Sequence, residues 1–323
     1  MDTSIEREDR LMMLESLKNV FWILVFPGLL FTVFLGLAAS WLVRKVSALV
    51  QWRVGPPVYQ PFADVMKLMG KEIMIPERSN RTVFIAAPLI GFSGVLLLAA
   101  VLWGAVVAPA KMPLGDVIVA LYLTVFPSLA LILGSSASGS PHSSIGTARE
   151  MKLVISYELP LVLALIVVLA KSGGNLSLAE LASRTPVLSI SGCIAFIVAL
   201  FCVQAKLGFT PFDMAEAETE LAGGVLLEYS GGLLAVWKLM QAMMLVTLPL
   251  FLVMVFLGGF HPSVWAGIGK YVLVLVLVIL IKNTNPRVRT DQAMRFFWIY
   301  CGVIMVVAVV LASLGAYFYI EWL

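Results

Sequence analysis

Residues 228–257 read EYSGGLLAVWKLMQAMMLVTLPLFLVMVFL, an apolar run of 30 residues with only two charged side chains, Glu228 and Lys238. A helix needs about 20 apolar residues to cross the hydrocarbon core of a bilayer. Strands of a membrane β-barrel are shorter and alternate between lipid-facing and lumen-facing residues, which this run does not do. The run therefore predicts a transmembrane helix, and it decides the fold class.

Seven more apolar runs lie along the 323-residue chain. Hydrophobic residues make up 61% of the sequence, whereas soluble domains contain roughly 45–50%. Only helices and closed barrels satisfy their backbone groups in lipid, so we expect one all-α, polytopic membrane domain over residues 1–323, without a soluble catalytic domain. The eight predicted spans are about 20–43, 82–107, 114–134, 153–170, 188–207, 228–257, 265–281 and 296–319.

The basic residues predict the orientation of these spans. Loops 44–81, 135–152, 208–227 and 282–295, counted together with Lys206 at the end of the fifth span, carry fourteen lysines and arginines, and the opposite side carries seven. By the positive-inside rule, we expect these loops in the cytoplasm and both termini outside the cell membrane. Residues 1–18 mix acidic with basic side chains, so we expect the first run to be a retained span and not a cleaved signal. The net charge of +3 reflects this topology and gives no reason to expect a nucleic-acid partner.

The first cytoplasmic loop predicts a short amphipathic helix at the membrane surface. Gly55-Pro56-Pro57 and Pro61 impose a stiff turn before it. Such a helix is either a simple surface anchor or, after an ordered turn, a platform for a partner. Its apolar side would hold Phe62, Val65, Met66, Leu68 and Met69, and its polar side Asp64, Lys67 and Lys71.

One carboxylate lies inside a predicted span. Glu158 belongs to the run 153–170 and precedes Pro160, which cannot donate a hydrogen bond to the carbonyl of Ser156. A charge is costly in hydrocarbon, so an acid within a span is a candidate for function. We expect Glu158 to handle protons; the alternative is a pairing with a basic residue of a neighbouring helix.

The loop 208–227 holds a dense acidic segment. Like charges this close raise one another's pKa values, which suits groups that bind and release protons near neutral pH. The alternative is an ordinary solvated loop. Helical spacing would place Asp213, Glu216 and Glu220 on one face, with Glu218 elsewhere, and Glu228 would join that face if the helix continues past Gly223-Gly224. The candidate residues for proton or ion coupling are thus Glu158, Asp213, Glu216, Glu218, Glu220 and Glu228.

The sequence lacks the motifs of independent redox or hydrolytic chemistry. Cys193, Cys202 and Cys301 are scattered in apolar runs, whereas an iron–sulfur cluster needs four thiolates at characteristic spacing. His142 and His261 are single residues in loops. The chain has no G-x-G-x-x-G, Walker or nucleophile-elbow motif. We therefore expect no cofactor, no metal site and no catalytic residue in this chain.

Several long motifs occur together in the sequence. They are Gln60-Pro61-Phe62-Ala63-Asp64, followed by Lys67 and Lys71-Glu72; Ser156-Tyr157-Glu158; Thr210-Pro211-Phe212-Asp213-Met214-Ala215-Glu216; Glu228-Tyr229-Ser230-Gly231; and Pro286-Arg287-Val288-Arg289. Together they closely resemble the family of the arm-linking membrane subunit of respiratory complex I, known as its H subunit. The resemblance covers nearly the whole chain, including the layout of eight spans.

The resemblance implies a subunit that joins a cytoplasmic electron-transfer arm to an ion-pumping membrane arm. Iron–sulfur clusters and a nickel–iron or related centre would lie in partners, namely an iron–sulfur small subunit and a large catalytic subunit. Other membrane subunits, antiporter-like ones among them, would complete the complex. The residues implied in arm docking or chamber lining are Arg53, Gln60, Asp64, Lys67, Lys71, Glu72, Arg287, Arg289, Asp291 and Arg295.

Two departures from complex I indicate a branch of the family. The stretch 53–60 is shorter than the corresponding complex I loop, and Arg149-Glu150-Met151 looks more like the energy-converting nickel–iron hydrogenases and their sulfur-reducing relatives. In those enzymes ferredoxin supplies the electrons and no quinone is needed. We therefore expect a ferredoxin-fed membrane-bound hydrogenase or sulfur reductase that translocates protons or sodium ions.

Three alternatives remain open from the sequence. The first is the quinone-chamber H subunit of an NADH- or other donor:quinone oxidoreductase (complex I). The second is a stand-alone cation–proton antiporter, although we find no inverted repeats of the kind that such transporters show. The third is a passive membrane anchor, which would not need carboxylates inside its spans.

Overall fold

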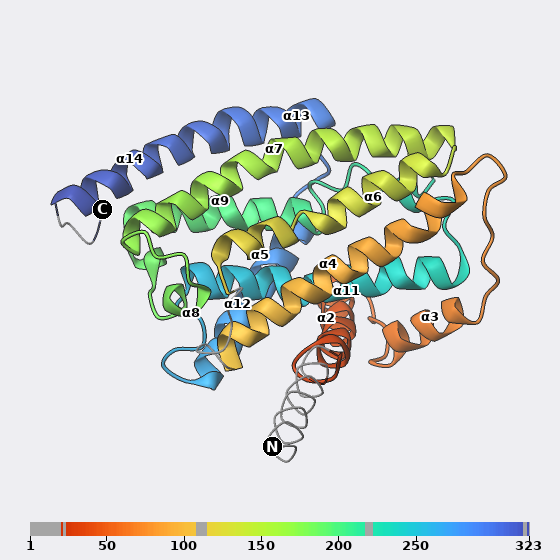
Figure 1. Ribbon diagram of the computed structural model, residues 1–323, viewed down its shortest axis with the longest axis horizontal. Helices are drawn as coiled ribbons and strands as arrows, with labels where there is room; N and C mark the ends of the chain where they lie inside the picture. Colours follow the sequence, from red (N-terminus) through yellow and green to blue (C-terminus); the bar gives the residue numbers. More distant parts are fainter. Residues whose placement is uncertain (1–20, 22–23, 108–114, 217–221, 319–321, 323) are drawn as a thin grey trace, which may run out of the picture.

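The computed structural model describes residues 21, 24–107, 115–216, 222–318 and 322. Over these residues the regular elements are helices (Figure 1), with one isolated β-bridge between Asp116 and Ser177. Seven of the described helical segments are long and apolar enough to cross a membrane, and α9 (Ile190–Lys206) is a shorter apolar helix of 17 residues. The prediction of an all-α, polytopic membrane protein is confirmed.

The other spans correspond to single helices or to helices in series. Five are single helices, and α5 with α6 forms a further span. The last span consists of α13, the π-helical segment η4 and α14. Their bounds are α2 (Leu29–Val50), α4 (Arg81–Val107), α5 (Val117–Leu123), α6 (Phe126–Ala137), α7 (Pro141–Lys171), α11 (Gly231–Phe256), α12 (Val264–Thr284), α13 (Thr290–Arg295), η4 (Phe296–Cys301) and α14 (Gly302–Phe318). The short helices are α3 (Gln60–Met69), α8 (Leu178–Leu181), η2 (Pro186–Leu188) and η3 (Gly224–Leu226).

Two helices extend well beyond their predicted spans. Helix α2 ends at Val50 and not at residue 43, because the exposed Arg44 side chain can reach water while the backbone stays helical. Helix α7 begins at Pro141 and not at residue 153. Ser140 precedes Pro141, and a proline at the first helical position needs no N–H partner and has its φ angle preset. Most of the predicted loop 135–152 is therefore helical.

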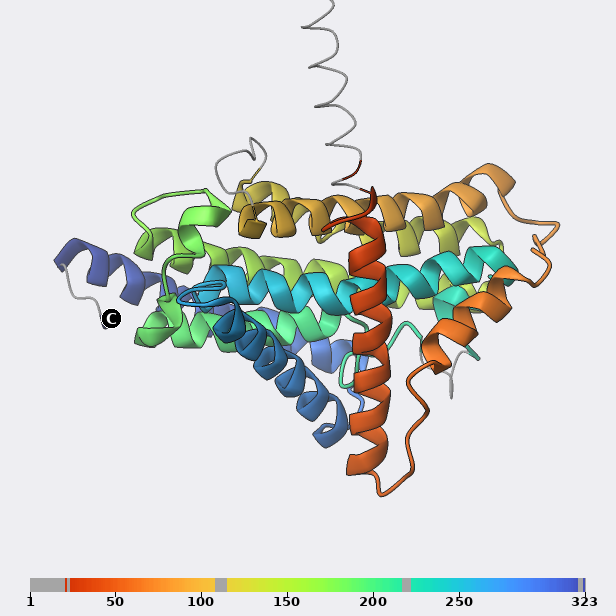
Figure 2. The same cartoon turned by 90° about the horizontal axis from the view of Figure 1, so that it is seen from below.

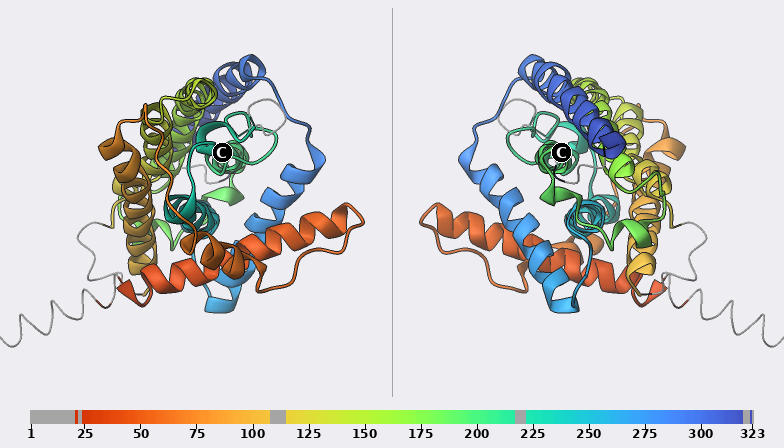
Figure 3. Two further views of the ribbon diagram at one scale, coloured as in Figure 1. Left: turned by 90° about the vertical axis from the view of Figure 1, so that its right-hand side faces the viewer. Right: turned by 90° about the vertical axis from the view of Figure 1, so that its left-hand side faces the viewer.

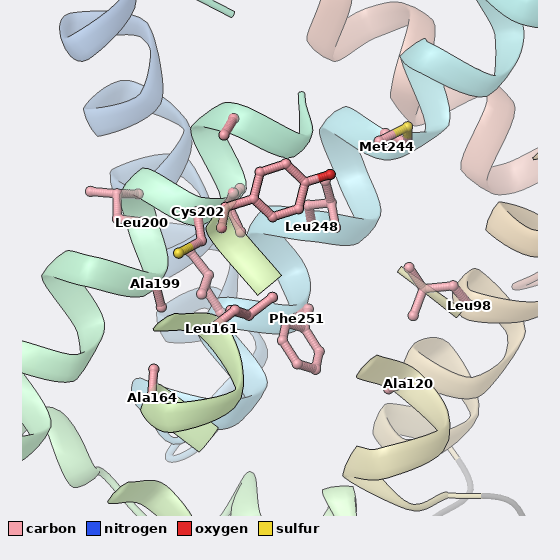
Figure 4. Packing of buried hydrophobic residues seen from close by; sticks show 14 of the residues in the cluster. Leu98, Ala120, Leu161, Ala164, Ala199, Leu200, Cys202, Met244, Leu248 and Phe251 are labelled. Atoms are coloured by element: carbon pink, nitrogen blue, oxygen red, sulfur yellow. The ribbon is translucent and has the colours of Figure 1, made fainter. Parts of the chain in front are cut away.

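Helix α11 forms the centre of the bundle. In its most apolar stretch, 94% of the residues are buried, and it packs against α2, α4, α9 and α12. Figure 4 shows Leu248 and Phe251 of α11 near Leu161 of α7. An apolar helix that is buried on all sides needs no polar face, which explains why residues 228–257 show almost no amphipathic pattern.

Two of the outer helices, α2 and α12, are strongly inclined to the other long helices of the bundle. Figures 2 and 3 show α2 and α12 at a large inclination to α4, α7 and α11. Only 28% of the apolar stretch of α2, 28% of that of α12 and 33% of that of the last span are buried. These helices therefore present apolar surface to lipid or to neighbouring subunits.

The amphipathic helix predicted in the first loop is present as α3. Its buried Val65 packs in one cluster with Leu37 of α2 and Leu239 of α11, and Phe62 packs against that cluster. Met66 and Met69 belong to the same apolar stripe but are exposed. The packed side fixes α3 to the bundle, where Asp64 and Leu68 of this helix line the larger polar cavity described below.

Candidate functional site

A buried ion pair joins α7 to the end of α9. The Lys206 ammonium lies against the Glu158 carboxylate, and the Lys206 side chain has no exposed area. The same ammonium lies 4.9 Å from the centre of the Tyr157 ring. The pairing that we considered for Glu158 as an alternative is thus present, and its role in proton transfer stays a prediction.

A second buried acid was not predicted from the sequence. Glu150 is buried on α7, two turns before Glu158, at a position that we had assigned to a cytoplasmic loop. Ser140-Pro141 was the available signal, because it predicts a helix start early enough to include Glu150. Buried acids need polar surroundings, and Glu150 finds them in a cavity at the centre of the site.

This small cavity has a volume of about 30 Å³. Glu150 and Lys206 line one side of it, and Glu216 and Gln241 line another. The rest of the lining is mostly apolar, but a space of this size beside these polar groups holds about two water molecules, each of which occupies roughly 10–15 Å³ on this measure. Water there would connect the carboxyl groups of Glu150 and Glu216 by hydrogen bonds.

A larger polar cavity of about 300 Å³ lies next to the small one. Basic side chains from several elements line it, together with Asp64 of α3. Asp213, Glu216 and Gln241 line both cavities, together with Leu207 and Gly208, and so supply the polar part of the wall between them. The basic residues are Arg44 of α2, Lys238 of α11, Lys282 of α12 and Arg287 of the following loop.

Glu216 is held by a polar contact with α11. The Gln241 side-chain amide donates a hydrogen bond from Nε2 to Oε1 of Glu216 at 2.8 Å. The Lys238 ammonium donates to Oε1 of the same Gln241 at 3.1 Å. The glutamine amide therefore connects a lysine at the large cavity to a carboxylate at the wall.

Asp213 connects two of the predicted cytoplasmic loops. Its carboxylate accepts a charged hydrogen bond from Nη2 of Arg287 at 2.5 Å. The Val288 N–H donates to the Pro211 carbonyl at 3.1 Å, and the Thr210 hydroxyl donates to the Lys282 carbonyl at 2.6 Å. These bonds attach the described part of the acidic loop to the end of α12 and to the loop that follows it. It is therefore not an ordinary solvated loop.

Phe212 anchors the acidic loop to the last span. Its ring is buried and lies 4.8 Å from the Phe297 ring and 5.7 Å from the Phe296 ring, measured between ring centres. Both partners belong to the π-helical segment η4, which the sequence did not predict. A π-helical segment realigns the side chains of its helix, and here it presents two aromatic rings to the loop.

The helical arrangement predicted for the acidic segment is wrong in the described residues. Residues 209–216 form turns and irregular backbone, and only Gly224–Leu226 form a short 3₁₀-helix. The backbone φ angle is +118° at Gly223 and +55° at Gly224, values that end a right-handed helix. Asp213, Glu216 and Glu228 therefore do not share a helical face. Glu218 and Glu220 lie outside the described residues.

Glu228 stands apart from the cavities. It is half-buried beside the buried Tyr229, and neither cavity, as lined by the described residues, includes it. The segment around it is tied to the first loop, since the Met74 N–H donates to the Ser230 hydroxyl at 2.9 Å. Its role in proton or ion coupling stays a prediction.

Most of the predicted docking residues are exposed. Asp64 and Gln60 are half-buried on α3; Asp64 accepts hydrogen bonds from Arg44 at 2.9 Å and from Gln60 at 2.8 Å. The bond from the Arg44 guanidinium holds the pKa of the Asp64 carboxyl below its usual range. Trp52 and Val54, between α2 and α3, are 98% and 97% exposed. The exposed docking residues are Arg53, Lys67, Lys71, Glu72, Arg287, Arg289, Asp291 and Arg295.

The sequence matches the family model described as NADH dehydrogenase over residues 22–313. The chain belongs to this family. It is 34% identical to the H subunit of the NADH-quinone oxidoreductase of Anoxybacillus flavithermus over 276 residues, which cover 79% of this chain and 81% of the relative. The corresponding H subunit of Thermomicrobium roseum is 36% identical over 308 residues, covering 83% of this chain and 88% of the relative.

A solved structure gives a second comparison for this family member. The fold is similar to a chain in the structure of the membrane-bound sulfane sulfur reductase, an archaeal respiratory membrane complex, with a TM-score of 0.79 and 26% identity. The similarity covers 88% of this chain and 96% of that one. The resemblance inferred from the motifs is confirmed, and both branches weighed from the sequence fit these comparisons.

The described residues contain no group of three or more His, Cys, Asp and Glu side chains arranged to hold a metal ion. Cys202 and Cys301 are buried and Cys193 is exposed, and all three are free thiols. What the site offers is a set of carboxylates, ammonium groups and small polar spaces. Such a set can bind, hold and pass protons.

Proposed function

We propose that this chain is the membrane subunit that couples electron transfer in a soluble arm to ion movement across the membrane. The observation that carries the proposal is the shared wall of Asp213, Glu216 and Gln241 between the two cavities. Through this wall, a polar route leads from the large cavity to Glu150 and on to the Lys206–Glu158 pair.

The electrostatics of the route support coupling. Glu150 and Glu216 line the same small cavity, so ionisation of one disfavours ionisation of the other. A proton that reaches Glu158 would leave the buried Lys206 charge without its counter-charge, which is costly inside the bundle. The next event is then release of a proton from this pair. Each protonation change would thereby drive the following one.

The electrons would stay in partner subunits. We assign the iron–sulfur clusters and a nickel–iron or related centre to a small and a large subunit of the soluble arm. The exposed basic residues of the loops after α2 and α12, with the exposed Trp52 beside them, would dock that arm. The poorly buried helices α2, α12 and α14 would face lipid or further membrane subunits.

Within the family we favour a ferredoxin-fed hydrogenase or sulfur reductase that moves protons or sodium ions. The similarity of nearly the whole chain to a sulfane sulfur reductase complex supports this choice. The alternative is a quinone-reducing complex, and the 34–36% identity to H subunits of NADH-quinone oxidoreductases favours it. In both cases the predicted cytoplasmic loops face the soluble arm in the cell membrane, with the termini outside.

The test is purification of the chain with its native partners, followed by identification of the metals and prosthetic groups. Proteoliposomes of the complex should take up ions when reduced ferredoxin is supplied without quinone, with protons or an added sulfane sulfur compound as the electron acceptor. Nickel in the preparation would identify a hydrogenase. Flavin with bound quinone, and ion uptake that needs NADH and quinone, would overturn the preferred branch in favour of the alternative.

A further inference from the structure

Lys238 is the only charged residue in the sequence of α11. Most of this helix is buried, whereas Lys238 is exposed and lines the large cavity. A lysine inside a transmembrane helix is costly, so it is a candidate for function by default. The ion-coupling route proposed above gives Lys238 no role.

Lys238 holds the side chain of Gln241, which lies one helical turn further along α11. The Lys238 ammonium donates to Oε1 of Gln241 at 3.1 Å, and the Gln241 amide donates from Nε2 to Oε1 of Glu216 at 2.8 Å. Residues three apart lie on the same face of a helix, so α11 presents both side chains to the large cavity. The two hydrogen bonds run in one direction, from the ammonium through the amide to the carboxylate.

The two partners of Gln241 fix the orientation of its amide. A glutamine offers an acceptor oxygen and a donor nitrogen. If the amide turned over, its nitrogen would face the Lys238 ammonium and its oxygen would face the Glu216 carboxylate, and both pairings are repulsive. While Lys238 occupies Oε1, Gln241 therefore donates to Glu216, and a hydrogen bond donated to a carboxylate favours the ionised form.

We infer that Lys238 positions the Gln241 amide and thereby favours the ionised form of Glu216. The inference rests on the proposed function, in which Glu216 binds and releases protons at the wall between the two cavities. Without Lys238 the amide is free to turn, and its oxygen can then accept a hydrogen bond from a protonated Glu216. Lys238 would thus set the pH at which this wall takes up its proton.

Other charged groups around Glu216 line the same two cavities and come from different elements. Among the described residues they are Glu150, Lys206 and Lys282, with the ion pairs Arg44–Asp64 and Arg287–Asp213. These groups remain in every variant of Lys238. A difference in the titration of Glu216 between such variants therefore reports the contact that Lys238 makes.

The test is an infrared titration of the assembled complex in detergent, in which the carboxylic acid band that Glu216→Gln removes is assigned to Glu216. Lys238→Met should move the midpoint of this band upward by about half a pH unit or more, because Glu216 then keeps its proton at higher pH. Lys238→Arg retains a charged donor and should stay close to the parent midpoint. In a Gln241→Leu background, Lys238→Met should cause no further shift, because no amide is left to position.

Controls separate this contact from general charge effects. Lys152→Met removes an exposed lysine of α7 that lines neither cavity and should leave the Glu216 band unmoved. Lys238 is itself exposed, so its replacement should not disturb the packing of α11, and Lys238→Ala provides a second uncharged side chain.

Three results would overturn the inference. They are an unmoved midpoint in Lys238→Met, an equal shift in the Gln241→Leu background, and the absence of a Glu216 band from both the parent and Lys238→Met. The infrared titration requires no ion movement. A shifted band in a complex that moves no ions would therefore contradict only the coupling proposal, whereas an unmoved band in a complex whose ion uptake depends on Glu216 would contradict only this inference.

Discussion

The buried ammonium of Lys206 and the carboxylate of Glu158 neutralise each other between α9 and α7. Neither charge is stable alone in an apolar bundle, since a buried charge without a partner is strongly disfavoured. Glu150 lies on the same helix as Glu158 and lines the small cavity together with Lys206. Lys206 is therefore the charge through which a protonation change at the small cavity can reach Glu158.

Removal of Lys206 should destabilise the protein, because Glu158 depends on Lys206 for neutralisation. Lys206→Met leaves the Glu158 carboxylate without its cation and should lower stability, but by less than the roughly 3–5 kcal/mol of a fully buried pair, because the Glu158 side chain is 22% exposed. Lys206→Met with Glu158→Leu removes both charges and should recover a large part of that loss. Thermal unfolding of the assembled complex in detergent measures both variants. Equal unfolding temperatures for the single and double variants would show that the pair is not coupled.

Glu150 should be required for ion movement, although the sequence did not predict it as a coupling residue. Glu150→Gln keeps the size of the side chain but removes its proton, and we expect a large loss of ions moved per electron. Glu216→Gln should behave in the same way, because both acids line the small cavity. Glu228→Gln should have a smaller effect, since Glu228 lies outside both cavities. A greater loss in Glu228→Gln than in Glu150→Gln would contradict this route.

The backbone beneath Glu216 depends on Gly224. A Cβ atom there would lie 1.8 Å from the Ala215 carbonyl oxygen, in addition to the strain of a φ angle of +55°. Gly224→Ala should therefore loosen the acidic loop, lower ion coupling and make the loop sensitive to protease. Gly174→Ala is the matched control, because Gly174 also has a positive φ angle but open space around it. Comparable protease sensitivity of the two variants would mean that contact with Ala215 is unimportant.

The exposed loops should hold the soluble arm by charge. Lys67→Glu/Arg289→Glu reverses two exposed basic residues, one on α3 and one before α13, and should release soluble subunits at moderate salt. Glu180→Lys, an exposed reversal on the predicted outer side, should have no such effect. Co-purification of the arm at increasing ionic strength measures the difference. Undiminished assembly of the double variant would count against docking through these loops.

The sequence predicted the fold class well because apolar runs of this length have few other solutions in a membrane. It predicted the site less well. Glu150 was missed because α7 starts at Pro141 and its first turns are polar. A hydropathy pattern finds only the apolar part of such a helix. From the spacing of its carboxylates, the acidic segment was expected to be helical. Tertiary contacts hold its described part in an irregular conformation instead, since Phe212 packs on η4 and Asp213 pairs with Arg287.

Contacts between distant segments account for what could not be predicted. Lys206 was counted as a cytoplasmic basic residue, and only the packing of α7 against α9 brings it to Glu158. Gln241 lies in the predicted span 228–257, and its hydrogen bond goes to Glu216, which lies 25 positions earlier in the acidic loop. Neither relationship leaves a periodic signal in a single sequence.

The central claim is that Glu158 couples electron transfer to ion movement, and one ratio tests it most directly. The assembled complex is reconstituted in sealed proteoliposomes, and ions taken up per electron transferred are measured for the parent, Glu158→Gln and Glu180→Gln. Glu180 is exposed on the predicted outer side and serves as the matched control. The account predicts that assembly persists in Glu158→Gln while ion uptake per electron is abolished, with the control at the parent value. An unchanged ratio in Glu158→Gln would contradict it and leave this acid a structural partner of Lys206.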